Sequence, residues 1–252
     1  MTEALRHLAL AFQFLTRLPL PADLGYSEER MARALYHFAT VGLCIGLALG
    51  AVHLALLQIF EPLLAAILTL AASIRLTGAF HEDGLGDLAD GLGGSPDRER
   101  ALEIMRDSRL GTYGTVALII VLAAKAAGLA ELAPWAAVAA IIGGHTLGRA
   151  AIVLIVRWSR YARPEGVGAF TKTTVPATAL ATPIAASLLA LACLAWAASP
   201  LAAAVSLIAV ACVAAFMLRY MLRRLDGYTG DGLGTVETLS ELAVILAVAA
   251  CL

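Results

Sequence analysis

The sequence predicts an all-α, polytopic integral membrane protein with about six or seven transmembrane helices and additional interfacial helices. Of its 252 residues, 60% are hydrophobic and only 15% are charged, against about 25% charged in an average soluble domain. Apolar runs of about 20 residues, long enough to cross a bilayer, recur along the chain. A soluble helical bundle would have too little polar surface at this composition. We therefore expect residues 1–252 to form a single integral-membrane domain.

The first helix is expected to lie at the membrane surface. Residues 4–18, ALRHLALAFQFLTRL, are too short and too polar to span a bilayer, and Pro19 and Pro21 end the segment. No small-residue cleavage site follows, so a cleaved signal peptide is not expected.

Seven apolar segments follow, of which the last is the least regular because Glu237 and Glu241 interrupt its start. Proline stands at or next to the beginning of four of them, as it commonly does in a first helical turn. The expected spans are 37–60, 62–80, 112–131, 134–156, 176–198, 200–218 and 236–252.

The basic residues support this division, because positive charge concentrates in the connections on the cytoplasmic side of a membrane. The connections around Glu61, Glu131 and Ser199, which alternation places on the other side, hold no lysine or arginine. Most of the 18 basic residues fall in segments on one side: Arg6, Arg17, Arg30, Arg33, Arg98, Arg100, Arg106, Arg109, Arg157, Arg160, Arg163, Lys172, Arg219, Arg223 and Arg224. We therefore expect a multi-pass protein of the cytoplasmic (inner) membrane with its long loops on the cytoplasmic face.

A few polar residues lie within the expected spans. His145 and Arg149 are one helical turn apart, and polar groups at that depth usually face a cavity or a partner, although Arg149 could also extend to the membrane surface. Arg75 allows the same two interpretations. The four cysteines lie in apolar runs without CxxC spacing and are expected to be small buried hydrophobic residues: Cys44, Cys193, Cys212 and Cys251.

The segment FHEDGLGDLADGLGG, residues 80–94, gathers acidic residues and glycines at the end of an apolar run. Asp83, Asp87 and Asp90 follow an i, i+4, i+7 pattern, which places Asp87 roughly 40° and Asp90 roughly −20° from Asp83, all on one face of a helix. Carboxylates so close repel one another, and Mg²⁺ is commonly held by a few carboxylates together with substrate phosphates. The pattern predicts a metal site, although a solvated acidic helix end is the simpler alternative.

Other residues of the segment are candidates for the same site. On a helix, Glu82 points about 100° away from Asp83. It is a further candidate metal ligand. Gly84, Gly86 and Gly91 leave the backbone bare, which would let a phosphate group approach, and their density costs helix stability.

The next segment, SPDRERALEIMRDSRLGTYG, is expected to begin a surface helix, with Ser95 as N-cap and Pro96 in the first turn. At its end, Arg106 and Arg109 could neutralise phosphate oxygens, and Asp107 could act as a ligand or a base. Ordinary interfacial charge is the alternative interpretation.

Two later segments on the same side show similar chemistry. RWSRYARPEG, residues 157–166, is basic, which either the positive-inside rule or anion binding explains. GYTGDGLG, residues 227–234, again surrounds an acidic residue, Asp231, with glycines.

Taken together, these motifs resemble the cobalamin synthase family, whose members are also called adenosylcobinamide-GDP ribazoletransferases. The acidic segment matches the family's DGLAD-xx-DG pattern except that Gly86 stands where alanine is usual, and Gly232 stands where the family more often has a larger residue. The motifs that carry the resemblance are FQFLTRLP (12–19), FHEDGLGDLADGLGG (80–94), MRDSRLGTYG (105–114), RYARPEG (160–166) and TGDGLGTVETLSE (229–241).

The resemblance implies an enzyme that joins adenosylcobinamide-GDP to α-ribazole or its 5′-phosphate, releases GMP and needs Mg²⁺. The expected metal ligands are Asp83, Asp87, Asp90 and Glu82. One carboxylate, Asp90 or Asp107, is a candidate to take the hydroxyl proton. The expected substrate-binding residues are Arg106, Arg109, Arg160, Arg163, Gly84, Gly91 and Asp231.

The expected partners are these two substrates and the lipid bilayer, with no nucleic acid, and the sequence leaves a homo-oligomer open. Two other functions are alternatives. A lipid-forming CDP-alcohol phosphotransferase would share the reaction type, but its DGxxAR run is absent, since positions 87 and 88 read Asp-Leu. A transporter would use the acidic residues as an ion path, but they cluster at one membrane face and no paired broken helices are evident.

Overall fold

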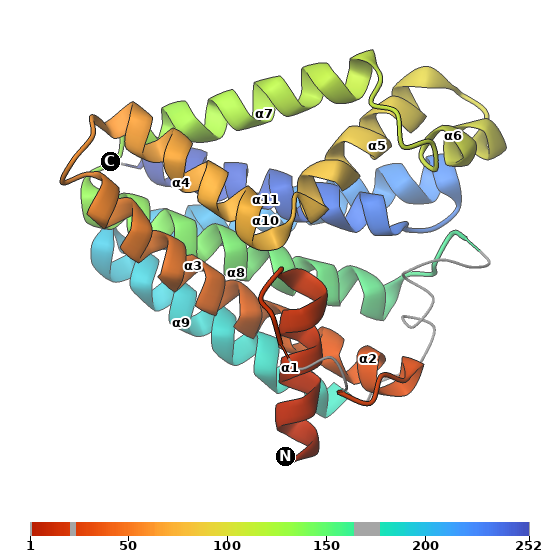
Figure 1. The fold of residues 1–252 in the computed structure, drawn as a ribbon, viewed down its shortest axis with the longest axis horizontal. Coiled ribbons are helices and arrows are strands. Elements are labelled where there is room, and N and C mark those ends of the chain that lie inside the picture. The colour runs from red at the N-terminus through yellow and green to blue at the C-terminus, as the bar shows by residue number, and fades with distance from the viewer. Residues whose placement is uncertain (1, 21–23, 164–176, 252) are drawn as a thin grey trace.

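The computed structural model describes residues 2–20, 24–163 and 177–251, and this part of the chain is helical without a β-strand (Figure 1). The predicted all-α class is therefore confirmed. The elements are α1 (Glu3–Leu15), α2 (Glu28–Ala34), η1 (Leu35–His37), α3 (Phe38–Leu56), α4 (Pro62–Thr77), α5 (Phe80–Gly94), α6 (Arg98–Ile104), α7 (Thr112–Ala130), α8 (Pro134–Trp158), η3 (Ala177–Leu180), α9 (Ala181–Ala197), α10 (Pro200–Leu225) and α11 (Gly230–Ala250).

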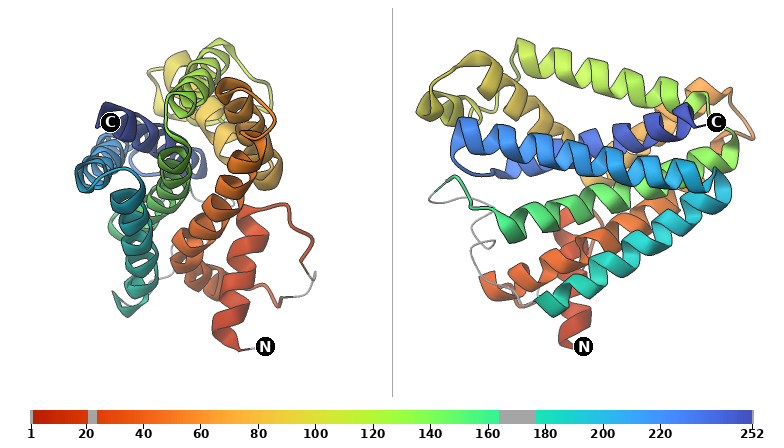
Figure 2. Two further views of the ribbon diagram at one scale, coloured as in Figure 1. Left: turned by 90° about the vertical axis from the view of Figure 1, so that its left-hand side faces the viewer. Right: turned by 180° about the vertical axis from the view of Figure 1, so that it is seen from behind.

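Six helical segments of the described chain are long and apolar enough to cross a membrane. They are α3 with the short helices that lead into it, α7, α8, α9 with η3, α10 and α11. They run lengthwise beside one another, and the two views of Figure 2 show their connections gathered at the two ends of the bundle. The predicted multi-pass membrane architecture is therefore confirmed.

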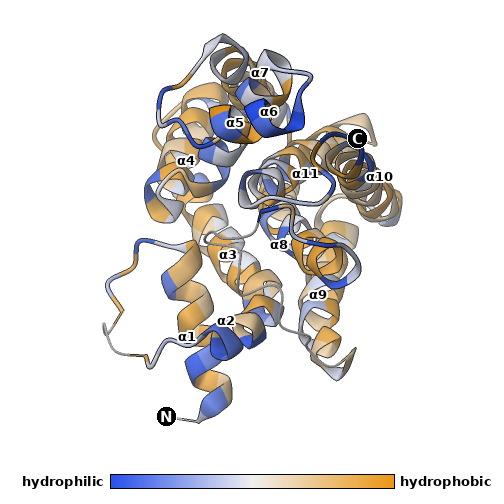
Figure 3. Ribbon diagram, turned by 90° about the vertical axis from the view of Figure 1, so that its right-hand side faces the viewer, coloured by the Kyte–Doolittle hydropathy of each residue, from blue (hydrophilic) through white to orange (hydrophobic). Residues whose placement is uncertain are grey.

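The helices α4 and α5 form a seventh crossing only when they are counted together, and they are bent by 91° relative to each other. The bend lies at Gly78 and Ala79, which have left-handed φ angles of 74° and 60°. With this pair as one broken span, the basic connections all fall at the same end of the bundle. Seen from that end, Figure 3 shows hydrophilic residues on α5, α6 and the neighbouring connections.

The structure corrects four of the predicted boundaries. The span expected at 62–80 ends at Thr77, because the left-handed turn stops α4 before the acidic segment. Ser95 is the C-cap of α5, whereas Asp97 caps α6 by accepting a hydrogen bond from the backbone N–H of Arg100. The last two helices extend beyond their apolar cores: α10 runs on through its arginines to Leu225, and α11 begins at Gly230.

The central helix is α8, which lies between α3 on one side and α11 on the other (Figure 1). Glycines permit both contacts, since a Cβ on Gly42 of α3 would overlap the His145 carbonyl of α8. On the other face, a Cβ on Gly144 would lie 2.9 Å from the Cα of Glu241 in α11. Small residues let helices approach closely in a bilayer, where packing drives association.

The helix α1 crosses the bundle instead of running along it (Figure 1), as expected for an interfacial helix. Its C-terminal end is attached to the broken span, because the Arg17 backbone N–H donates to the Leu76 carbonyl at 2.7 Å.

Cys44 and Cys212, expected to be buried, are exposed on the surface of the bundle, and Cys193 and Cys251 are half-buried. The predictions for Lys172, for 164–166 of the RYARPEG motif and for the first residue of the 176–198 span lie outside the described residues.

Candidate functional site

The acidic helix α5 is docked on the first turns of α11. A Cβ on Gly84 would lie 2.8 Å from the Asp231 carbonyl oxygen, and one on Gly234 would lie 3.2 Å from the His81 backbone. The Thr235 hydroxyl donates to the Gly84 carbonyl at 3.2 Å. Glycine on both helices therefore brings the acidic segment of α5 against Asp231.

This docking unites two acidic motifs that are far apart in the sequence. Asp83 is exposed and Asp87 half-buried on α5, and Asp87 lies within electrostatic range of Asp83, Asp231 and Arg163. Arg163 donates to the Asp231 carboxylate at 2.8 Å. We call Asp83, Asp87 and Asp231 the acidic cluster, in which three carboxylates share one guanidinium among the described residues.

The acidic cluster lies at the edge of a cavity of about 240 Å³ between α5, α11, α8 and the N-terminal helices. Asp83, Arg163 and Asp231 contribute its polar wall, whereas most of the remaining wall is apolar or aromatic. The other lining residues are Phe14, Leu15, Leu35, Phe38, Phe80, His81, Ile152, Tyr161, Gly230, Leu233 and Gly234.

Asp90 lies on α5 like the other three predicted metal ligands, but its carboxylate is bonded to the start of α7. Its oxygens accept hydrogen bonds from the backbone N–H groups of Gly111, at 2.6 Å, and Gly114, at 2.9 Å. A Cβ on either glycine would lie 2.5 Å from an Asp90 oxygen. Asp90 thus caps the N-terminus of α7, and the two glycines of the LGTYG sequence make room for it.

The remaining candidates on α5 also contact other helices. Glu82 lies within electrostatic range of Lys125 on α7. A Cβ on Gly91 would lie 2.9 Å from the Ala101 carbonyl oxygen of α6. Gly84 and Gly91, predicted to admit a phosphate, are both buried and instead allow close helix packing.

A second hollow, of about 500 Å³, opens on the other flank of α5 and shares no lining residue with the first cavity. Its lining includes Arg100 and the two arginines that the sequence indicates as candidate phosphate contacts, Arg106 and Arg109. Arg109 donates to both oxygens of Asp107, and this hydrogen bonding lowers the pKa of that carboxyl. Asp107 is therefore a weak base in the arrangement seen here.

Arg160, a predicted substrate-binding residue, is bonded to Asp226 in this structure. Its guanidinium pairs with the Asp226 carboxylate and donates to the Asp226 carbonyl at 2.8 Å. The two adjacent segments are also joined through the backbone, with Tyr228 N–H donating to the Arg160 carbonyl at 2.9 Å and Ala162 N–H to the Tyr228 carbonyl at 2.8 Å. Arg160 therefore secures the segment that carries Arg163, which is the arginine that reaches the acidic cluster.

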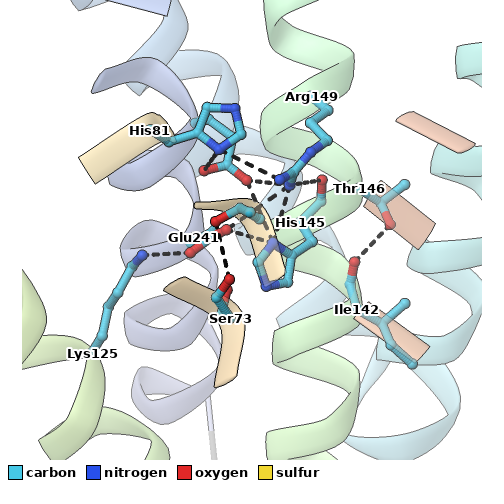
Figure 4. Close-up of polar contacts among 10 residues, drawn as sticks. Ser73, His81, Lys125, Ile142, His145, Thr146, Arg149 and Glu241 are labelled. Atoms are coloured by element: carbon cyan, nitrogen blue, oxygen red, sulfur yellow. Dashed lines mark hydrogen bonds and ion pairs between the residues drawn. The ribbon is translucent and has the colours of Figure 1, made fainter. Parts of the chain in front are cut away.

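Directly behind the acidic cluster lies a buried network of charged groups, which Figure 4 shows converging from α5, α7, α8 and α11. Arg149 of α8 pairs with Glu237 of α11, and Lys125 of α7 pairs with Glu241 of α11. Except for Glu241, at 11%, these charged side chains are at most 2% exposed. The two cations and two carboxylates balance, which is the arrangement that makes buried charge tolerable.

Two histidines connect this network to neighbouring elements. His145 Nδ1 lies 2.6 Å from a Glu241 oxygen. His81, which also lines the 240 Å³ cavity, places its Nδ1 3.3 Å from Glu237. His145, Glu237 and Glu241 have the proximity of a metal-ligand set, with candidate atoms within 4.8 Å, but fixed cations already pair with both carboxylates. We therefore assign this group to helix association.

Most of these residues are recognisable in the sequence as isolated polar residues in apolar segments, but their pairing is not. The signal that could have found it is the presence of two carboxylates, Glu237 and Glu241, in one expected span and of single cations in others, because charged groups within a membrane pair with one another.

Substitution of Glu237 tests how much the buried network contributes to the stability of the protein. Glu237→Gln leaves Arg149 without its buried carboxylate, and we expect the free energy of unfolding to fall by about 3–5 kcal/mol. The double variant Arg149→Met/Glu237→Gln removes both charges and should recover much of that loss. Denaturation in detergent micelles measures this, with the exposed Glu131→Gln as the control. A single variant as stable as the wild type would contradict the assignment.

Substitutions of Asp90 and Asp87 should have different effects on stability when denaturation is measured in the same way. Asp90→Asn places an amide N–H₂ against one of the two backbone donors, so we expect a loss of about 1–3 kcal/mol. Asp87→Asn relieves repulsion from Asp83 and Asp231 and should leave the thermal midpoint unchanged or raised. Equal destabilisation by the two substitutions would contradict the separate roles given to the two carboxylates.

Comparison with known proteins agrees with the motifs. The family model for cobalamin-5-phosphate synthase matches residues 7–249. An adenosylcobinamide-GDP ribazoletransferase of Leptothrix cholodnii is 42% identical over 94% of this chain and 92% of its own. One of Polaromonas naphthalenivorans is 40% identical over 100% of both chains, and one of Rhizobium etli is 42% identical over 97% of this chain and 96% of its own. No solved structure matches. The chain belongs to the cobalamin-5-phosphate synthase family.

Proposed function

We propose that the protein joins adenosylcobinamide-GDP to α-ribazole or α-ribazole 5′-phosphate, with release of GMP. The product is adenosylcobalamin or its 5′-phosphate. The observation that carries this proposal is the acidic cluster with Arg163 at the edge of a cavity. The names of the similar proteins support the choice of substrates.

We propose Mg²⁺ as the cofactor, held by Asp83, Asp87 and Asp231. The donor set fits this ion, because hard divalent cations take oxygen ligands and Mg²⁺ is often bound by a few carboxylates plus substrate phosphates. Three carboxylates accompanied by one guanidinium also leave negative charge that a divalent cation would offset. When bound, Mg²⁺ would supply Lewis-acid stabilisation of charge on the diphosphate oxygens.

The reaction needs a ribose hydroxyl oxygen to attack the phosphorus next to the cobinamide. A new O–P bond forms, the P–O bond to the bridging oxygen breaks, and GMP leaves with that electron pair while the hydroxyl proton is released. Arg163, bonded to Asp231 and lining the cavity, is positioned to neutralise a phosphoryl oxygen. Asp107 lies in the separate hollow and is bonded to Arg109, which makes it a poor acceptor for the proton.

Arg106 and Arg109 form the second anion site in this proposal. Asp83 and Asp90, which line the two hollows, are seven residues apart on one helix, or about 10 Å along its axis. A nucleoside diphosphate end is long enough to reach from the acidic cluster to the arginines beyond α5. Arg106 is exposed and lines the hollow beside Arg109.

We further propose that this end of the bundle faces the cytoplasm, in the cell's inner membrane. The positive-inside rule supports this orientation, since the basic connections lie at the end that carries the acidic cluster. Charged and phosphorylated substrates would then reach the site from the cytoplasm without crossing the bilayer.

The test is GMP release from adenosylcobinamide-GDP by the purified protein in lipid vesicles. We expect release to require both ribazole and Mg²⁺, and Asp87→Asn to abolish it while the protein stays folded. The exposed Glu99→Gln on α6, outside the lining of both cavities, is the matched control and should retain turnover.

Other outcomes would contradict the proposal in different ways. GMP release without ribazole would indicate a hydrolase. No release by folded wild-type protein under any of these conditions would exclude the transferase. Full activity of Asp87→Asn would exclude the acidic cluster as the reaction site.

A further inference from the structure

The cavity beside the acidic cluster has an aromatic wall that the proposed chemistry does not use. Phe14 of α1 stacks on Phe38 of α3, with ring centroids 5.6 Å apart, and packs edge-to-face on Phe80 of α5 at 5.3 Å. All three line the cavity. Three elements, one of them the interfacial helix with the FQFLTRLP motif, thus bring phenylalanines to one place.

Aromatic side chains at this position suggest an aromatic ligand. Bases stack on aromatic side chains in many nucleic-acid-binding proteins because every base has a π-face. The same cavity lining contains three charged side chains, Asp83, Asp231 and Arg163. A molecule with a flat apolar ring at one end and hydroxyl groups at the other matches both parts of this lining.

The volume of the cavity indicates which of the two substrates of the proposed reaction it can hold. About 240 Å³ is below the range of about 300–1,000 Å³ that holds drug-sized ligands. A corrin macrocycle with its amide side chains and axial ligand is several times larger than a nucleoside and does not fit. A ribazole is a benzimidazole nucleoside, which combines one flat ring system with one ribose.

We propose that this cavity is the subsite for the aromatic nucleoside, with its base against Phe14, Phe38 and Phe80. Its ribose is then directed to the acidic cluster, where the attacking hydroxyl is needed. The inference rests on the proposed function for the identity of the nucleoside. It also gives α1 a role, because Phe14 of this helix lines the cavity.

The test is direct binding of α-ribazole, measured by calorimetry on the protein in nanodiscs without Mg²⁺ or corrinoid. Phe14→Leu keeps an apolar side chain and removes the ring, so we expect the Kd to rise at least about fivefold. Phe12→Leu is the matched control, because Phe12 lies on the same helix, is half-buried and is outside the cavity lining; its Kd should stay at the wild-type value. In turnover, Phe14→Leu should raise the KM for ribazole and leave the KM for adenosylcobinamide-GDP unchanged.

A second variant guards against a folding defect. Phe80 is 41% exposed, so Phe80→Leu should fold and should weaken ribazole binding in the same way. Wild-type affinity in both cavity variants, or a raised KM for the corrinoid alone, would overturn the assignment. Failure of the proposed function would look different: ribazole would bind and depend on Phe14, but GMP would not be released.

Discussion

Pairing of charge inside the helix bundle is the constraint on which the remaining structure depends. Arg149 and Lys125 are buried where no water can solvate them, and each requires a carboxylate from α11. Because Glu237 and Glu241 are one turn apart, α11 must present one face to both α7 and α8. Glycines of α8 shape the surface that receives this face.

This arrangement also fixes the start of α5. The left-handed turn at Gly78 and Ala79 breaks the span and brings His81 into the bundle, where it contacts Glu237. Two residues further on, Asp83 lies at the edge of the cavity. The break therefore lets one helix contribute first to the buried network and then, within one turn, to the acidic cluster.

Much of the fold followed from the sequence, because length and hydropathy suffice to find spans and the basic residues suffice to orient them. Hydropathy did not show that the span starting at Pro62 is broken, because the apolar run continues across Gly78 and Ala79 to Phe80. The one-face spacing of Asp83, Asp87 and Asp90 was confirmed as helical, yet Asp90 is bonded to α7. Spacing along one helix does not reveal which neighbouring helix each side chain contacts.

Local sequence patterns also could not predict the association of α5 with α11. Asp231 was a predicted substrate-binding residue, but its position beside Asp83 and Asp87 depends on glycine contacts between segments about 150 residues apart, as in the bond from Thr235 to Gly84. The phenylalanines of the cavity come from three such separate segments. Each is an ordinary apolar residue in its own helix and gains significance only from the packing.

The most direct test of the account is whether the acidic cluster binds a divalent cation through both helices. Mn²⁺ binding can be measured by electron paramagnetic resonance on the protein in nanodiscs without substrates. We expect the wild type and the control Glu99→Gln to bind Mn²⁺, and Asp87→Asn on α5 and Asp231→Asn on α11 each to lose it. Undiminished binding in Asp231→Asn would contradict a site shared between α5 and α11.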